Sequence, residues 1–147
     1  MKKTVLFIAI TLFTFNGFAQ VKLGGGISFW SETALEAKAN FGLSEQIDLS
    51  GTIDYFLVDN VSLILLGVDG HYNFEVGDGF KIYPMAGLNL VSASAGGVSV
   101  SQFYLGLGGG AIYDISDSVS LYGEVKHLLA DVSDTGISLG VMFSLGN

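Results

Sequence analysis

Large apolar residues alternate with small or polar residues along most of the chain after position 20. The clearest stretch, Ile137-Ser138-Leu139-Gly140-Val141-Met142-Phe143, lies near the end of the sequence. Successive side chains of a β-strand point to opposite sides, so this alternation predicts strands with one apolar and one polar face. Eight strands are expected, at residues 21–30, 33–42, 46–57, 60–75, 80–91, 101–113, 119–130 and 136–146.

Short clusters of turn-forming residues separate the expected strands. They contain Gly, Asp, Asn and Ser and lie at residues 44–45, 58–60, 77–79, 92–99, 116–118 and 133–136. The strands run about 10 to 16 residues, which equals or exceeds the ~9–11 residues that cross a membrane when tilted. The pattern therefore predicts an all-β fold, an eight-stranded antiparallel up-and-down transmembrane barrel with short outer loops and no helix of consequence.

The polar face of the expected strands consists mainly of Gly, Ser and Asn. In a soluble barrel this face would meet water and would carry many long charged side chains. Small residues instead fit the crowded inside of a narrow barrel, where charges are tolerated when they are paired. The apolar face then meets lipid. We expect a structural polar network in the lumen, formed by Lys22, Glu36, Lys38, Asp54, Asp69, His71, Lys81, Glu124 and Lys126.

Aromatic residues provide an independent indication of membrane insertion. Aromatic rings favour the headgroup level at both faces of a bilayer, so a spanning barrel is expected to carry two belts. If the chain enters the barrel on the periplasmic side, the lower belt contains Phe41, Tyr72, Phe74, Phe80, Tyr113 and Phe143, and the upper belt contains Phe29, Tyr55 and Phe103.

The composition agrees with a membrane barrel and argues against other classes. Apolar residues make up 50% of the chain and charged residues 14%, whereas soluble domains average about 25% charged residues. After residue 19, no segment is apolar over the length of a spanning helix. The formal net charge is −8, so nucleic acid, which needs basic partners, is not expected to bind.

The start of the chain has the pattern of a secretory signal peptide. Met1-Lys2-Lys3 is a positive n-region, Thr4–Phe15 is an apolar h-region, and Asn16–Ala19 precedes a cleavage site. A transmembrane anchor fits less well, because a spanning helix needs roughly 20 apolar residues. We expect a signal peptide at 1–19 and one barrel domain at 20–147, exported to the outer membrane of a Gram-negative cell. The absence of Cys excludes an acylated lipoprotein and disulfides.

Four stretches carry a resemblance to a known family. They are Leu66-Gly-Val-Asp-Gly-His-Tyr-Asn-Phe74, Phe80-Lys-Ile-Tyr-Pro-Met-Ala-Gly-Leu-Asn-Leu90, Leu105-Gly-Leu-Gly-Gly-Gly-Ala-Ile-Tyr113 and Leu121-Tyr-Gly-Glu-Val-Lys126. The chain resembles the small eight-stranded outer-membrane β-barrel proteins, of the porin-family or OmpA/OmpX-like type, particularly forms found in Bacteroidetes-type bacteria. The resemblance implies outer-membrane lipid and the barrel-insertion machinery as partners. The sequence departs from the family by ending Phe143-Ser-Leu-Gly-Asn147 rather than on a terminal aromatic residue, and no peptidoglycan-binding domain is expected after the barrel.

Candidate chemistry is sparse. Asp69 and His71 are two residues apart on one strand face, and a carboxylate can orient an imidazole for general-base catalysis. A polar lumen accounts for both residues equally well, and no Ser or Cys next to either His is marked out as a nucleophile. The Asp-rich turns at 114–117 and 131–134 could hold Ca²⁺, but Asp and Ser are ordinary turn residues. We therefore expect no catalytic, cofactor-binding or metal site.

Three functional hypotheses are compatible with these observations. The first is a non-enzymatic outer-membrane barrel with a narrow, polar, side-chain-filled lumen and a structural or surface-interaction role in the envelope. The second is a soluble periplasmic or secreted lipocalin-like barrel, which would hold an apolar ligand with its apolar face inside. The third is an envelope enzyme that uses Asp69 and His71. The small, sparsely charged polar face favours the first hypothesis.

Overall fold

The computed structural model describes residues 3–4, 20–129 and 134–145. These residues contain the strands β1 (Val21–Phe29), β2 (Thr33–Gly42), β3 (Ile47–Phe56), β4 (Ser62–Tyr72), β5 (Phe74–Gly77), β6 (Phe80–Ala95), β7 (Val98–Asp114), β8 (Val119–Leu129) and β9 (Asp134–Leu145). The predicted signal peptide lies almost entirely outside the described residues, as does the first residue of the predicted turn at 133–136.

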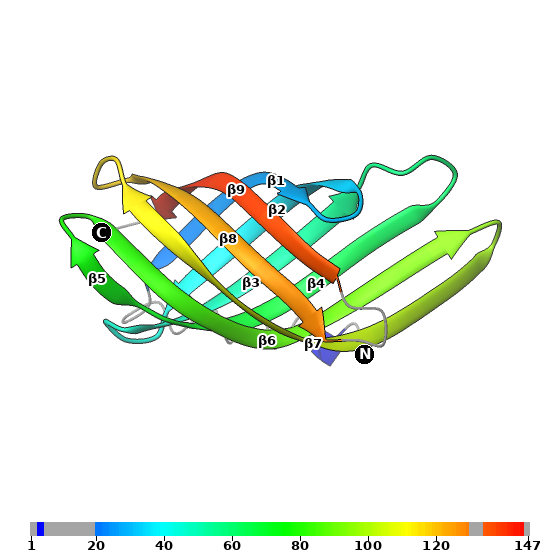
Figure 1. Ribbon diagram of the computed structural model, residues 1–147, viewed down its shortest axis with the longest axis horizontal. Helices are drawn as coiled ribbons and strands as arrows, with labels where there is room; N and C mark the ends of the chain where they lie inside the picture. The colour runs from blue at the N-terminus through cyan, green and yellow to red at the C-terminus, as the bar shows by residue number, and fades with distance from the viewer. Residues whose placement is uncertain (1–2, 5–19, 130–133, 146–147) are drawn as a thin grey trace.

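The strands close into a barrel (Figure 1). Apart from β4 and β5, neighbours in sequence pair in antiparallel fashion, and two further pairings, β1 with β9 and β4 with β6, complete the ring. β5 pairs with the beginning of β6 and continues β4 after a break at Asn73, so the two together correspond to the single strand predicted at 60–75. The fold is therefore the predicted closed, eight-stranded antiparallel barrel.

The two ends of the barrel differ. At one end, here called the terminal end, β1 begins and β9 finishes, with Val21 paired to Leu145. The opposite end, here called the hairpin end, carries the long β6–β7 hairpin, which projects beyond the other strands in Figure 1. The two ends therefore expose different groups, a set of short turns at one and a two-stranded ribbon at the other.

The projecting hairpin corrects one prediction. Residues 92–99 were expected to form an outer loop, but β6 continues to Ala95 and β7 begins at Val98. Gly96 and Gly97 alone make the turn, with positive φ values of 57° and 80°. A Gly-Gly pair supports the two-residue turn whose twist matches that of the flanking strands. The alternation of Ser with Val or Ala on both sides of this pair is itself a strand pattern, which the loop assignment overlooked.

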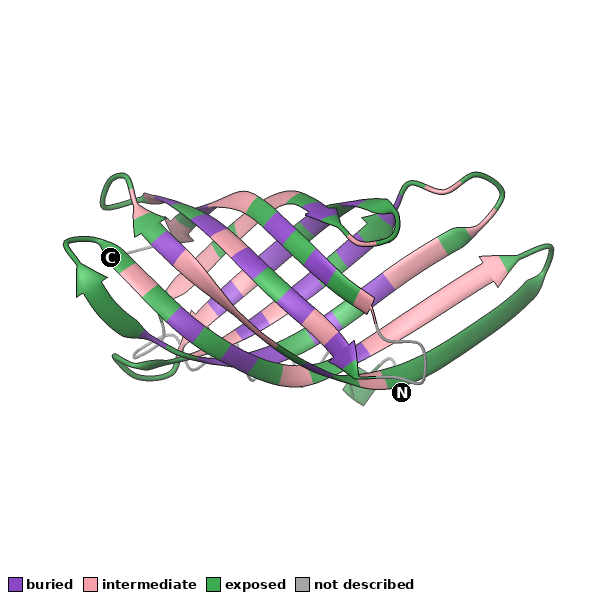
Figure 2. Ribbon diagram, in the orientation of Figure 1, coloured by how far each residue is buried: buried purple, intermediate pink, exposed green. Residues whose placement is uncertain are grey.

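The predicted faces of the strands are confirmed. Exposed and buried residues alternate along most strands (Figure 2). On β2, the Leu35 side chain is 53% exposed, whereas the adjacent Glu36 is 7% exposed. Apolar residues point outward and polar or small residues point inward, which is the arrangement of a membrane barrel. The lipocalin-like hypothesis required the opposite arrangement.

Within the residues that the structure describes, no helix is long and apolar enough to span a membrane.

Inward-facing glycines provide the space that larger interior side chains occupy. A Cβ atom built on Gly110 would lie 2.7 Å from the hydroxyl oxygen of Tyr83, and one built on Gly140 would lie 2.6 Å from that of Tyr122. Both tyrosines are buried. The small residues of the polar face are therefore complementary in shape to the rings beside them.

Candidate functional site in the barrel interior

The centre of the barrel contains an ion pair between two strands that are not neighbours in the ring. The ammonium of Lys38 on β2 contacts the carboxylate of Glu124 on β8, and both side chains are buried. The other oxygen of Glu124 accepts a hydrogen bond of 2.7 Å from the Tyr83 hydroxyl and lies 3.7 Å from Nε2 of His71. The His71 and Tyr83 rings are stacked, with centroids 4.3 Å apart. Side chains from β2, β4 and β6 therefore meet at Glu124 of β8.

A second carboxylate, that of Glu36 on β2, is held by neutral donors. The Tyr122 hydroxyl donates to its Oε1 at 2.5 Å, and the Ser138 hydroxyl donates to its Oε2 at 3.0 Å. The Tyr122 ring also lies beneath the Lys38 ammonium, 4.9 Å from its centroid, which is within the range of a cation–π contact. Tyr122 thus connects the Glu36 carboxylate to the Lys38–Glu124 pair.

A second ion pair lies nearer the hairpin end. The Lys126 ammonium is 2.7 Å from Oδ2 of Asp69 and donates a 3.1 Å hydrogen bond to the side-chain oxygen of Asn89. Asp69 therefore pairs with a lysine, whereas His71 lies against Tyr83 and Glu124. The two residues considered as a catalytic pair take different partners.

Asp54 is buried beside a second carboxylate. It is 2% exposed and lies beside Glu36 in the β2–β3 register, yet its Oδ1 has no hydrogen-bond partner. Four buried carboxylates, those of Glu36, Asp54, Asp69 and Glu124, share the central lumen with the two lysines already described. The interior is therefore richer in acids than the balanced pairing expected from the sequence.

The remaining predicted network residues, Lys22 and Lys81, lie at the terminal end. They line an open polar cavity of about 960 Å³ at the barrel mouth. The Lys22 ammonium is 3.5 Å from the Asp114 carboxylate and donates a 3.4 Å hydrogen bond to Ser120. Seven of the nine predicted residues thus lie deep in the barrel, and these two lysines stand apart from them.

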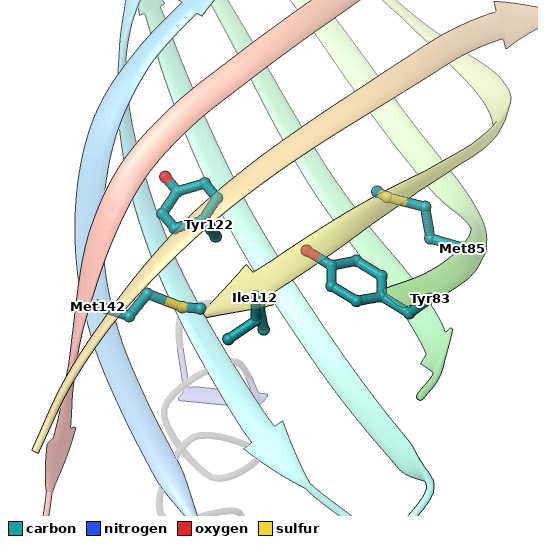
Figure 3. Close-up of a cluster of buried hydrophobic side chains, with 5 residues drawn as sticks. All are labelled: Tyr83, Met85, Ile112, Tyr122 and Met142. Atoms are coloured by element: carbon teal, nitrogen blue, oxygen red, sulfur yellow. The ribbon is translucent and has the colours of Figure 1, made fainter. Parts of the chain in front are cut away.

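Apolar side chains also project into the interior, and the predicted network did not include them. One cluster, toward the terminal end, contains Tyr83, Met85, Ile112, Tyr122 and Met142 from four strands (Figure 3). The other, toward the hairpin end, contains Ala34, Phe56, Leu65 and Leu128. The alternation assigned these positions to the inner face, but reasoning from polarity alone did not select them.

The arrangement positions charges but leaves little room for chemistry. The side chains of Lys38 and His71 have no exposed surface, and that of Glu124 is 4% exposed. Among residues 3–4, 20–129 and 134–145, no three His, Asp or Glu side chains are grouped so as to hold a metal ion. What the geometry provides is two buried ion pairs and hydrogen bonds across the lumen.

The fit around Tyr122 leads to a stability prediction. Replacing Gly140 by alanine is expected to destabilise the barrel by about 1–3 kcal/mol, because overpacking forces neighbouring atoms apart. The new Cβ would lie 2.5 Å from the Gly25 carbonyl oxygen and 2.6 Å from the Tyr122 hydroxyl. The midpoint of urea unfolding in lipid measures the effect. Gly51→Ala is the matched control, because there the nearest atom is 4.0 Å away, and an equal loss in both variants would contradict the packing explanation.

Comparison with solved structures finds barrels of the same kind. The N-terminal β-barrel domain of Pseudomonas aeruginosa OprF is 17% identical over 87% of this chain and 98% of that chain, with a TM-score of 0.73. Ail, the attachment invasion locus protein of Yersinia pestis, is 14% identical over 86% and 97%, with a TM-score of 0.62. Neisserial surface protein A is 19% identical over 86% and 96%, with a TM-score of 0.60. At such identities the likeness shows the fold alone.

The family is shown by the sequence. No curated protein matches the chain. The family model described as outer membrane protein beta-barrel domain, however, matches residues 7–144, which is most of the chain. The closed barrel with an apolar exterior agrees with that match. The chain therefore belongs to the outer membrane β-barrel domain family and is an integral protein of the outer membrane.

Proposed function

We propose that this protein is a non-enzymatic outer-membrane barrel whose lumen is closed to solutes, with a structural or surface-interaction role in the cell envelope. The observation that carries the proposal is the order in which ion pairs and apolar clusters follow one another along the lumen. The Lys38–Glu124 pair and the Lys126–Asp69 pair lie between two clusters of buried apolar side chains. An eight-stranded barrel has an interior just wide enough for side chains to fill it.

The contacts of the two candidate catalytic residues support a role without catalysis. Asp69 is engaged by Lys126, and the imidazole of His71 is stacked on Tyr83. A general base must reach the proton that it removes from a substrate. Neither group is accessible from either mouth of the barrel, since both residues are at most 2% exposed. These contacts are those of a structural polar network, whereas a catalytic pair would need Asp69 and His71 to contact each other and to reach a substrate.

The proposal also assigns surroundings to each surface. Outer-membrane lipid covers the apolar exterior, where the paired rings of Tyr72 with Phe74 and Phe80 with Tyr113 form part of an interfacial belt. We place the terminal end in the periplasm and the hairpin end outside the cell. The segment 1–19 serves as the export signal, the barrel-insertion machinery assembles the strands, and nucleic acid is not a partner.

Conductance across a planar lipid bilayer tests the closed lumen. The purified, refolded protein is expected to give no steady channel currents, because paired charges and apolar side chains occupy the path between the two mouths. A general porin inserted in the same bilayers serves as the positive control. Folding of the test protein is verified separately. In detergent the unboiled barrel stays folded, so its gel mobility differs from that of the boiled sample.

Stable, reproducible single-channel steps from verified barrels would overturn the closed-lumen proposal. The structural role would be contradicted by turnover of a lipid or peptide that disappears in His71→Ala while the barrel remains folded. Neither result would affect membership of the family, which rests on the sequence match and on the fold.

A further inference from the structure

A small pocket lies at the hairpin end, outside the polar network. Its volume is about 130 Å³, and it is partly open to the surroundings. The walls include Phe56, Leu65 and Leu128, the buried apolar residues of the cluster at this end. Trp30, which follows β1, packs against the same cluster. The proposed closed lumen does not account for an accessible apolar pocket in this position.

The size of the pocket limits what it can hold. An apolar cavity of roughly 150 Å³ in another protein stays dry and binds benzene. The pocket here has nearly the same volume, and its lining includes the apolar side chains of Phe56, Leu65 and Leu128. One aromatic ring or one branched alkyl group therefore fits, and a lipid acyl chain of ordinary length does not.

The rim of the pocket is acidic. Glu32 and Asp134 belong to its lining, together with Ser31, whose hydroxyl donates a 3.1 Å hydrogen bond to Asp134. None of the ion pairs found among the described residues includes Glu32 or Asp134. Of the four lysines after residue 19, two pair with acids in the central lumen, and two line the mouth at the terminal end. The apolar pocket therefore lies beside two carboxylates that are outside every ion pair of the described part of the chain.

Trp30 forms part of the pocket wall. Its indole ring lies against the backbone at Gly136, where an added Cβ would be only 2.3 Å from a ring atom. This close packing holds the ring in place at the pocket wall.

We propose that this pocket binds a compact organic cation, with one aromatic or branched aliphatic group among Trp30, Leu65 and Leu128 and its ammonium group beside Glu32 and Asp134. Shape selects the apolar group, and charge complementarity selects the cation. The proposal goes beyond the structural role stated above. It also stands apart from the conductance result, because the pocket lies on the hairpin side of the buried ion pairs.

Three probes of similar size test the proposal on the intact barrel in vesicles of zwitterionic lipid. The probes are 2-phenylethylammonium, the neutral 2-phenylethanol and the anionic 3-phenylpropanoate, which share an aromatic ring and differ in charge. Trp30 is the only tryptophan in the chain, so intrinsic tryptophan fluorescence reports directly on the pocket. A saturable change is expected with the cation, at a dissociation constant at least about fivefold lower than for the other two probes.

Variants separate a specific site from simple attraction to an acidic surface. Glu32→Gln and Asp134→Asn are each expected to weaken binding of the cation about two- to fivefold, as expected for the loss of one exposed ion pair. Leu65→Phe is expected to abolish saturation by filling the pocket. Asp59→Asn is the matched control, because Asp59 is an exposed acid between β3 and β4 and does not line the pocket.

Three results would overturn the proposal. Equal fluorescence responses to the three probes would show partitioning into lipid rather than recognition of a cation. If Asp59→Asn and Glu32→Gln weaken binding of the cationic probe equally, the probe is attracted by the acidic residues of the whole hairpin end and not by the pocket. Saturable binding that persists in Leu65→Phe, with the barrel still heat-modifiable on gels, would place the ligand elsewhere.

Discussion

Glu124→Ala is expected to destabilise the barrel by about 3–5 kcal/mol, because removing one partner of a buried ion pair leaves the other charge uncompensated. The Lys38 ammonium would remain with no exposed surface and without its carboxylate. The Tyr83 hydroxyl would lose its acceptor as well. The measurement is the urea dependence of folding in lipid vesicles, followed by gel mobility with and without boiling.

A double variant keeps this prediction measurable if Glu124→Ala fails to fold. Lys38→Met combined with Glu124→Ala removes both charges, and it is expected to recover much of the lost stability, since apolar replacements of buried pairs are often neutral or stabilising. Asp117→Asn, in an exposed turn, is the control and should leave the unfolding midpoint unchanged. A wild-type midpoint for Glu124→Ala would contradict the importance of the pair.

Leu139→Lys is expected to destabilise the barrel by about 2–4 kcal/mol, the depth-dependent cost of a lysine or arginine on the lipid face near the middle of the membrane. Leu139 lies in the middle of β9 and is 56% exposed, with Ile27 beside it on β1. The interior tolerates Lys38 and Lys126 because each is paired with a carboxylate. The exterior offers no such partner.

The same unfolding experiment in vesicles measures this second effect. Ser118→Lys is the matched control, because Ser118 is exposed in the turn between β7 and β8 at the terminal end. It should unfold at the wild-type urea concentration. If Leu139→Lys is as stable as this control, the outward face of β9 does not meet lipid, and the membrane position assigned to this strand is wrong.

The strands and their faces could be predicted from the sequence because the signal is local. Residues two apart share a face, so Leu35 and Glu36 could be assigned to opposite sides without knowledge of any other strand. The same rule placed Phe56 and Leu65 inside, but the expected interior network contained only polar residues and therefore omitted both. At 92–99, small polar residues were interpreted as a loop although their alternation continued.

The partners of the interior residues could not be predicted, because they are set by closure of the sheet. Lys38 and Glu124 are 86 residues apart, and their strands are separated by β1 and β9 in the order of the ring. Their contact depends on which inward-facing residues of opposite walls lie at the same height. That height follows from the tilt and stagger of all the strands together.

The sequence by itself determined that this protein is an all-β chain with an apolar and a polar face, because period-two alternation depends only on the geometry of a single strand. It thereby placed the apolar face in lipid and the charges inside. Only the tertiary structure decided that Lys22 and Lys81 lie apart from the central ion pairs, and that Trp30 meets Leu65 and Leu128 in a pocket. These contacts join residues that are distant along the chain, and a closed barrel is what brings them together.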